Sequence, residues 1–202
     1  MKPENRNEQV MELLLQSLEH EKGGVEVYET ALKCAVNEDL KEEWEKYLEE
    51  TMHHVEVLTE VCGTLGVDPE KQTPGVLVVR HLGQSLVKAM EMALQAGKAE
   101  AAQLVACECV VLAETKDHLD WELIGKCGEK LLKGKEGKAL KDAYQEIEDQ
   151  EDEHLYHTKG WCRELWLQSL GMKAVLPPPE EKQHVTTAIG AARAEQSAEK
   201  AR

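Results

Sequence analysis

Apolar side chains recur along this chain at every third or fourth position, the spacing that places them on one face of an α-helix. β-branched residues, which favour strands, show little clustering outside residues 76–79. The pattern therefore predicts an all-α protein. The expected helices cover residues 8–36, 40–62, 74–96, 98–132 and 138–170.

Turn and cap residues group four of these five helices into two pairs. A short turn at 37–39 joins the first two helices and a glycine-bounded turn at 134–137 joins the last two, so each pair should form an antiparallel hairpin. Between the pairs, Thr73 and Pro74 are the residue types of an N-cap and a first helical position. We therefore expect a four-helix bundle of two hairpins, joined by a long crossover that contains its own helix.

A length of 202 residues suits one domain whose core needs neither disulfides nor a structural metal. We expect this domain to occupy residues 8–171. Three consecutive prolines at 177–179 stop the helical pattern, and a polar, alanine-rich segment follows them. Residues 172–202 are therefore expected to be a proline-rich stop and a mobile polar tail.

The formal net charge of −15 at pH 7 disfavours nucleic acids and anionic membranes as partners, because their phosphate groups would repel the chain. The sequence contains neither a run of about 18 apolar residues that could span a membrane nor an apolar secretion signal at its start. Its six cysteines include no C-x-x-C pair of the kind found in zinc and redox sites. These features predict a soluble, reduced, cytoplasmic protein.

The candidate chemistry lies in a repeated motif. Glu50-x-x-His53 belongs to the second expected helix and Glu151-x-x-His154 to the last, so each hairpin carries one copy. Three residues turn a helix through about 300°, so the carboxylate and the imidazole leave one face and can share a cation. One such pair arises easily by chance when 31% of residues are charged, but two copies in equivalent helices indicate a metal site.

Glutamates of the remaining helices complete the expected ligand set. Glu21 lies in the apolar stripe of the first helix, about as far from the turn as Glu50. In the helix over 98–132 we choose Glu114, because its height matches Glu151 and because it precedes an aromatic residue by seven positions, as Glu21 does. The alternative ligands are His54 in place of His53, and His118, Glu108 or Glu122 in or beside the place of Glu114.

Two further features of the first helix lie beside this site. Gly23 and Gly24 directly follow the Glu21–Lys22 pair and cost the helix about 1 kcal/mol each relative to alanine. They suggest a close approach of another helix, a π-bulge, or merely a weak turn. His20 belongs to no motif and is expected at the surface.

With this ligand set, the chain resembles the rubrerythrin and bacterioferritin branch of the ferritin-like superfamily over residues 8–171. The order Glu21-x6-Tyr28 followed by Glu50-x-x-His53 is especially similar to the first half of a rubrerythrin. The resemblance implies two iron ions, or manganese in their place, held by Glu21, Glu50, His53, Glu114, Glu151 and His154. Unlike rubrerythrins, the sequence has no rubredoxin-type cysteine module, so the electron donor would be an external partner.

Two classes of function are consistent with these features. A dinuclear carboxylate site can act on dioxygen, peroxide or ferrous iron, so the chain would be a di-iron oxidoreductase, ferroxidase or peroxidase, or a non-catalytic metal carrier or store. We expect a homo-oligomer, with a dimer as the simplest form. The alternative is a metal-free ferritin-like scaffold that acts as a stress or interaction protein.

Overall fold

A computed structural model of the protein describes residues 3–173, with side chains from residue 7 onward. Within this range the regular structure consists of five α-helices and no strand, which confirms the prediction of an all-α protein. The expected tail lies outside the described residues from position 174 onward. The helices are α1 (Pro3–Cys34), α2 (Glu38–Leu65), α3 (Pro74–Gln95), α4 (Ala99–Lys130) and α5 (Gly134–Ser169).

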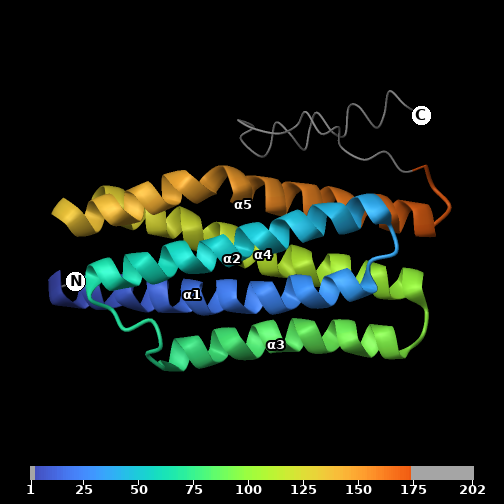
Figure 1. Ribbon diagram of the computed structural model, residues 1–202, viewed down its shortest axis with the longest axis horizontal. Coiled ribbons are helices and arrows are strands. Elements are labelled where there is room, and N and C mark those ends of the chain that lie inside the picture. Colours follow the sequence, from blue (N-terminus) through green and yellow to red (C-terminus); the bar gives the residue numbers. More distant parts are fainter. Residues whose placement is uncertain (1–2, 174–202) are drawn as a thin grey trace.

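Four of the helices form a bundle, and the fifth lies along its outside (Figure 1). α1 and α2 form one antiparallel hairpin, and α4 and α5 form another. α1 also packs against α4, and α2 packs against α5, so the two hairpins meet face to face. α3 covers α1 and α4 and carries the chain back along the bundle, so that α2 and α4 run in the same direction.

Polar side chains and glycines define where the helices begin and end. Asn37 caps α2 by accepting a hydrogen bond from the backbone nitrogen of Leu40 at 3.0 Å. Thr73 caps α3 in the same way, with Pro74 in the first turn as expected. α2 continues past its expected end and stops at Gly66, which takes a left-handed conformation with φ of 67°.

The interior of the bundle consists of two apolar clusters with a polar layer between them. Along each bundle helix, buried apolar residues are interrupted near the middle by buried acidic, histidine or threonine side chains. The largest buried side chains of one cluster are Leu14, Leu18, Leu58, Trp121, Ile124, Leu140 and Ile147. Those of the other cluster are Tyr28, Leu40, Trp44, Tyr47 and Met90.

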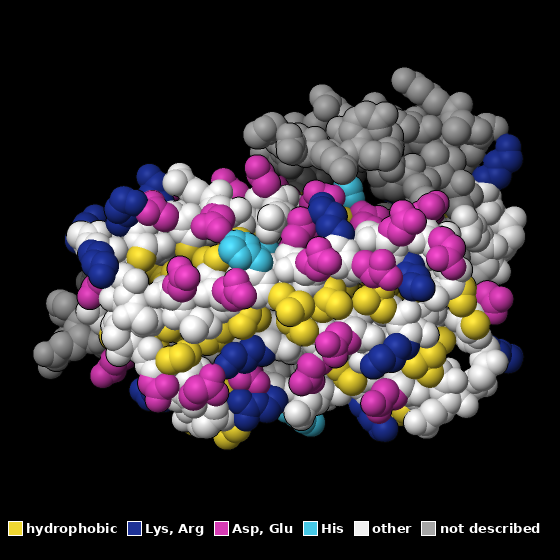
Figure 2. All heavy atoms as spheres, viewed as in Figure 1, with side chains coloured by type: hydrophobic (Ala, Val, Ile, Leu, Met, Phe, Trp, Pro, Cys, Tyr) yellow, Lys and Arg dark blue, Asp and Glu magenta, His cyan; other side chains and the backbone are white. Residues whose placement is uncertain are grey.

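The outer surface carries many charged side chains of both signs. Figure 2 shows acidic and basic groups spread over the whole visible face, in keeping with a net charge of −15, and apolar side chains lie between them. No helix in the described part of the chain has a stretch that is long and apolar enough to cross a membrane.

Candidate metal centre

Five ionisable side chains from all four bundle helices meet in the polar layer. α1 contributes Glu21, α2 His54, α4 Glu114, and α5 both Glu151 and His154. Each lies within the apolar stripe of its helix, so packing of the stripes turns it inward. None of the five is more than 2% exposed, so their charges are removed from water almost completely.

His54 lies between two of the buried carboxylates. Its Nδ1 is 3.3 Å from Oε1 of Glu21 and 3.1 Å from Oε1 of Glu151. Its Nε2 lies 2.8 Å from the side-chain oxygen of Gln150, to which the N–H donates, so Nδ1 faces the two carboxylates. We call Glu21, His54 and Glu151 the first group; their ligand atoms all lie within 4.8 Å of one another.

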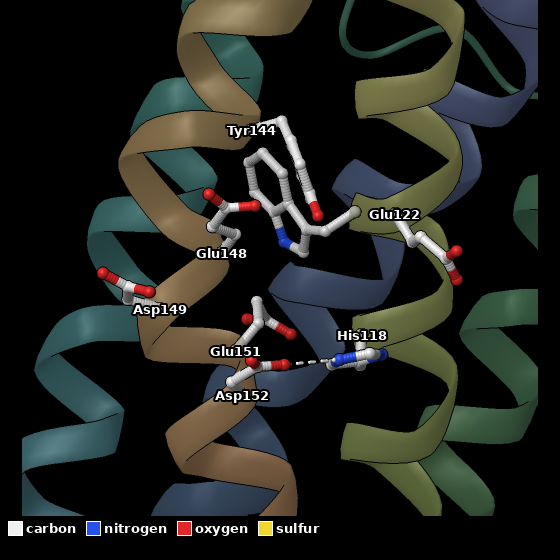
Figure 3. A pocket seen from close by; sticks show the side chains of 8 residues that line it. His118, Glu122, Tyr144, Glu148, Asp149, Glu151 and Asp152 are labelled. Atoms are coloured by element: carbon white, nitrogen blue, oxygen red, sulfur yellow. Dashed lines mark hydrogen bonds and ion pairs between the residues drawn. The ribbon is translucent and has the colours of Figure 1, made fainter. Parts of the chain in front are cut away.

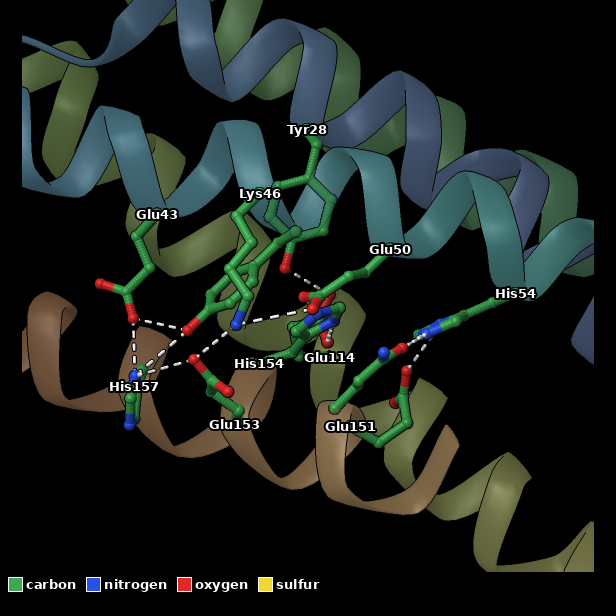
Figure 4. A network of polar contacts seen from close by, with 12 residues as sticks. Tyr28, Glu43, Lys46, Glu50, His54, Glu114, Glu151, Glu153, His154 and His157 are labelled. Atoms are coloured by element: carbon green, nitrogen blue, oxygen red, sulfur yellow. Dashed lines mark hydrogen bonds and ion pairs between the residues drawn. The ribbon is translucent and has the colours of Figure 1, made fainter. Parts of the chain in front are cut away.

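A second group shares one of these carboxylates. It consists of Glu114, Glu151 and His154, whose ligand atoms also lie within 4.8 Å of one another. The Nδ1 of His154 is 3.6 Å from Oε2 of Glu114, and its Nε2 is 2.9 Å from Oε2 of Glu50, which α2 brings in from the rim. The two groups and Glu50 form what we call the centre (Figure 4).

Aromatic side chains hold two of the carboxylates in place from outside the centre. The indole nitrogen of Trp121 donates to Oε1 of Glu21 at 2.6 Å, and the hydroxyl of Tyr28 donates to Oε1 of Glu114 at 2.9 Å. The other oxygen of Glu114 lies toward His154, whereas the bonded oxygen of Glu21 is also the one that lies beside His54. Such outer hydrogen bonds orient ligands in metal sites and tune their affinity.

Several buried polar atoms of the layer have no hydrogen-bond partner among the described residues. A buried polar atom without a partner costs stability, and native proteins keep such atoms rare. Apart from Nε1 of Trp44 and Oγ1 of Thr158, they are atoms of carboxylates and imidazoles, the groups that bind cations. These atoms are Oε2 of Glu21, Nδ1 of His54, Oε2 of Glu114, Oδ1 of Asp117, both carboxylate oxygens of Glu151 and Nδ1 of His154.

The electrostatics of the layer reflect an excess of carboxylates over histidines. Burial lowers the pKa of His54, but the carboxylates of Glu21 and Glu151 outweigh it and raise this pKa to about 11. Burial also lowers the pKa of His154, but the carboxylates of Glu114 and Glu50 outweigh it and raise this pKa to about 9. Burial raises the pKa of Glu151 to about 7, with the nearby glutamates acting in the same direction. The excess of carboxylates thus favours the protonated forms of His54, His154 and Glu151.

Carboxylate oxygens with imidazole nitrogens are the donor set of iron, manganese and zinc sites. No protein-family model, curated protein or solved structure matches this chain. The side chains of the centre fit a pair of divalent cations on their own chemistry, because their unpartnered atoms are ligand atoms and one carboxylate belongs to both groups.

Five of the six residues expected from the sequence meet in or at the centre, and the sixth does not. Glu21, Glu114, Glu151 and His154 are buried there, and Glu50 reaches it from a partly exposed position. His53 instead points outward, with 46% of its side chain exposed and its Nε2 2.9 Å from Glu146. The alternative ligand, His54, occupies the inner place.

The three alternatives to Glu114 lie away from the ligand atoms. Glu108 is exposed and accepts a hydrogen bond from Trp166 at 3.1 Å. Glu122 is 45% exposed and pairs with Lys126. His118 is 27% exposed and pairs with Asp152 at 2.8 Å. The structure thus places Glu114 in the layer, as height and aromatic spacing suggested.

Two polar residues of the layer were missed or misplaced by sequence analysis. Asp117, one turn after Glu114, is 4% exposed, and burial together with the neighbouring carboxylates raises its pKa well above the usual range. Its place in the buried stripe of α4 could have revealed it. His20 was expected at the surface but is buried, with its Nε2 2.9 Å from the backbone oxygen of Ala113.

The glycine pair of α1 marks a close approach of helices. A Cβ added to Gly24 would lie 3.2 Å from Cγ2 of Thr51 on α2, and one added to Gly23 would lie 3.9 Å from Cα of Gly83 on α3. α1 is a regular α-helix throughout this stretch, so the π-bulge alternative is wrong. Small residues here let the backbone of α1 run close to both neighbours, directly after Glu21.

A third cluster of metal-binding residue types lies nearer the surface. Its members are Glu43, Glu153 and His157, which we call the outer group. Glu43 accepts hydrogen bonds from the hydroxyl of Tyr47 and the indole of Trp161, and its Oε1 lies 2.6 Å from Nδ1 of His157. These bonds lower the pKa of Glu43, although burial acts in the opposite direction.

Proposed function

We propose that the centre is a dinuclear metal site that works on dioxygen, peroxide or ferrous iron. One observation carries this proposal: two three-residue groups share Glu151, and each group contains buried carboxylate oxygens that have no hydrogen-bond partner among the described residues. A purely structural polar layer would be expected to satisfy these atoms internally. Cations at the two groups would satisfy them.

We also propose that the fold is the ferritin-like arrangement. Its support is the order of elements, in which a hairpin, a crossover helix and a second hairpin follow one another, with α1 beside α4 and α2 beside α5. In ferritin-like proteins the ligands project inward from all four bundle helices at mid-length. The polar layer between the two apolar clusters has this position.

Iron is the metal we favour, with manganese as the alternative that the same donors accept. In the first position, Glu21, His54 and Glu151 would hold one ion. In the second, Glu114, Glu151 and His154 would hold the other, with Glu50 at the rim accepting a hydrogen bond from Nε2 of His154. When bound, the two ions would each supply or take up one electron, so that the pair exchanges two with the substrate.

The protein's own residues set the conditions for that chemistry. The two apolar clusters exclude bulk water from the layer on both sides. His54 and His154 carry protons in the metal-free state and release them when cations bind. Glu50 is the glutamate of the centre with solvent contact, at 19% side-chain exposure, so it can pass protons between the centre and water. A reductase activity would need an external electron donor.

Anaerobic titration with ferrous iron tests this proposal. We expect about two ions per chain, followed by an oxygen-dependent rise in near-ultraviolet absorbance when air is admitted. Glu151→Gln should abolish binding of both ions because it alters the shared carboxylate. Glu43→Gln is the matched control in the outer group and should still bind two.

Metal analysis of the purified protein decides between this function and the alternative scaffold. A chain that binds no iron, manganese or zinc, and whose melting temperature does not respond to them, would be a metal-free protein. A bound metal at a hundred times its Kd should instead stabilise the fold by about 2.7 kcal/mol.

A further inference from the structure

A pocket opens between α4 and α5 at the level of the centre (Figure 3). Its volume is about 70 Å³, which is room for a few water molecules or a partly hydrated ion. Gly125 shapes one wall, because a Cβ there would lie 2.6 Å from the ring of Tyr144. The lining residues are His118, Trp121, Glu122, Tyr144, Glu148, Asp149, Glu151 and Asp152.

The inner end of this pocket is the shared carboxylate of the centre. Glu151 is 1% exposed, lines the pocket, and has no hydrogen-bond partner for its Oε2 among the described residues. Trp121, another lining residue, donates to Glu21 of the first group. The pocket therefore leads from the surface to the side chain that both groups require.

The outer end of the pocket is strongly acidic. Glu122, Glu148, Asp149 and Asp152 surround it, and Lys126 pairs with Glu122. Nε2 of His118 lies 2.8 Å from Oδ1 of Asp152, and the two side chains are 27% and 46% exposed. Both lie beside Glu151 in Figure 3. Acidic walls in a concave site concentrate cations and raise their association rates.

On the opposite side of the centre, between α2 and α5, a lysine ammonium lies among the carboxylates. There the ammonium of Lys46 lies 2.8 Å from Glu153 and 3.5 Å from Glu50 (Figure 4). A cation that approached Glu50 from solvent would have to displace this ammonium. The electrostatics of the two sides thus favour the α4–α5 pocket for cations.

We propose that the pocket between α4 and α5 is the entry route by which a divalent cation reaches the centre. His118 and Asp152 form the first contact, and Glu151 receives the ion from them. This inference rests on the proposed metal function and adds a path to it. It also gives a role to His118 and Glu122, which lie too far out to belong to the two groups.

Stopped-flow loading of the metal-free protein with Co²⁺ tests the route, because tetrahedral or five-coordinate Co²⁺ absorbs visible light. In the variant Glu148→Gln/Asp152→Asn, the loading rate should fall about tenfold at low salt, while the final number of ions per chain stays unchanged. Salt should slow the unchanged protein, and the variant should lose most of this dependence. Glu42→Gln/Glu45→Gln removes the same charge from the exposed face of α2 and should load at the normal rate.

Lys46→Gln supplies the reciprocal measurement. The route predicts a change of less than about twofold in this variant, because cations do not pass Lys46. A large gain in rate there, or an unchanged rate in the pocket variant, would overturn the route while leaving the metal site intact. An unchanged protein that takes up no Co²⁺ and no Fe²⁺ would overturn both the route and the proposed function.

Discussion

The centre and the outer group contain the same kinds of residue but differ in how their charges are balanced. Both bring a histidine within reach of two carboxylates. In the outer group, both oxygens of Glu43 accept hydrogen bonds, and Lys46 pairs with Glu153. In the centre, by contrast, Oε2 of Glu21, Oε2 of Glu114 and Oε2 of Glu151 have no hydrogen-bond partner among the described residues.

This difference is the reason why we propose the centre, and not the outer group, as a metal site. In the outer group, tyrosine, tryptophan and histidine side chains supply hydrogen-bond donors to Glu43. Hydrogen-bonded groups of this kind stabilise the packing of helices. The centre leaves its ligand atoms facing each other at a cost in stability. We therefore expect the two groups to respond in opposite ways to matched substitutions.

The largest difference should appear in metal affinity when each histidine is removed in turn. His154→Ala should cost one ion per chain or weaken its binding at least about 100-fold, because loss of a ligand exceeds the cost of losing an orienting residue. His157→Ala should leave affinity within about twofold. Equilibrium dialysis with Fe²⁺ under nitrogen measures both. Equal losses in the two variants would mean that the outer group takes part in binding.

Stability of the metal-free protein should change in opposite directions. Glu151→Met replaces a buried excess charge with an apolar side chain of similar size and should raise the free energy of unfolding by about 2 kcal/mol. Glu43→Gln removes a charged acceptor from His157 and Trp161 and should lower it by about 2 kcal/mol. Urea unfolding in the presence of a chelator gives both values. Two destabilised variants would contradict the difference in charge balance.

Metal binding should strengthen with pH. His54 and His154, with pKa values of about 11 and 9, are protonated in the metal-free protein at neutral pH, so each must release a proton when its nitrogen binds a metal. Affinity should rise about tenfold per pH unit for each ion between pH 6 and 8, since one proton is displaced per histidine. Titration calorimetry in buffers of different ionisation enthalpy counts these protons. Binding without proton release would show that neither imidazole is a ligand.

The smallest difference should separate two tyrosines that both contact the ring of His154. Tyr28→Phe removes the hydroxyl that orients Glu114 and should weaken metal binding by at most about tenfold. Tyr47→Phe removes a bond to Glu43 in the outer group and should leave metal affinity unchanged. Competition with a coloured chelator resolves changes of this size.

Much of the fold could be predicted from the sequence because each helix has a strong apolar stripe. The helices were expected to within a few residues at most ends. The largest differences are at three ends: α1 already begins at Pro3, within a charged segment, α5 begins at Gly134, inside the expected turn, and α2 passes Gly63 and stops at Gly66. Either glycine could end a helix, and only the backbone shows which one adopts a positive φ.

A residue of the centre could be predicted where its position along the helix axis and its place in the apolar stripe indicate the same level of the bundle. Glu21, Glu114 and Glu151 each lie in an apolar stripe, and helix geometry places them at one level. The choice between His53 and His54 failed on spacing, because positions three and four after Glu50 both lie near its face. The stripe of α2, which includes Tyr47 and Leu58, points to His54, and this is the histidine that the structure buries.

The burial and the pKa of some side chains depend on contacts between helices, so they cannot be predicted from the pattern of one helix. The burial of His20 depends on its bond to Ala113 of α4, and the raised pKa of Asp117 depends on carboxylates from α1 and α5. Neither dependence is encoded in the local pattern of the helix that carries the residue. Positions of this kind become predictable only once the packing of the hairpins is known.

The shared use of Glu151 also constrains the order in which the molecule assembles. Glu114, Glu151 and His154 all belong to the α4–α5 hairpin, so the second group can form as soon as these two helices pair. The first group joins residues from both halves of the chain and must wait for the hairpins to dock, a step whose long sequence separation makes it slow. A partly folded chain would therefore already contain one of the two groups that we propose as metal sites. An ion bound there could connect the two hairpins as they dock.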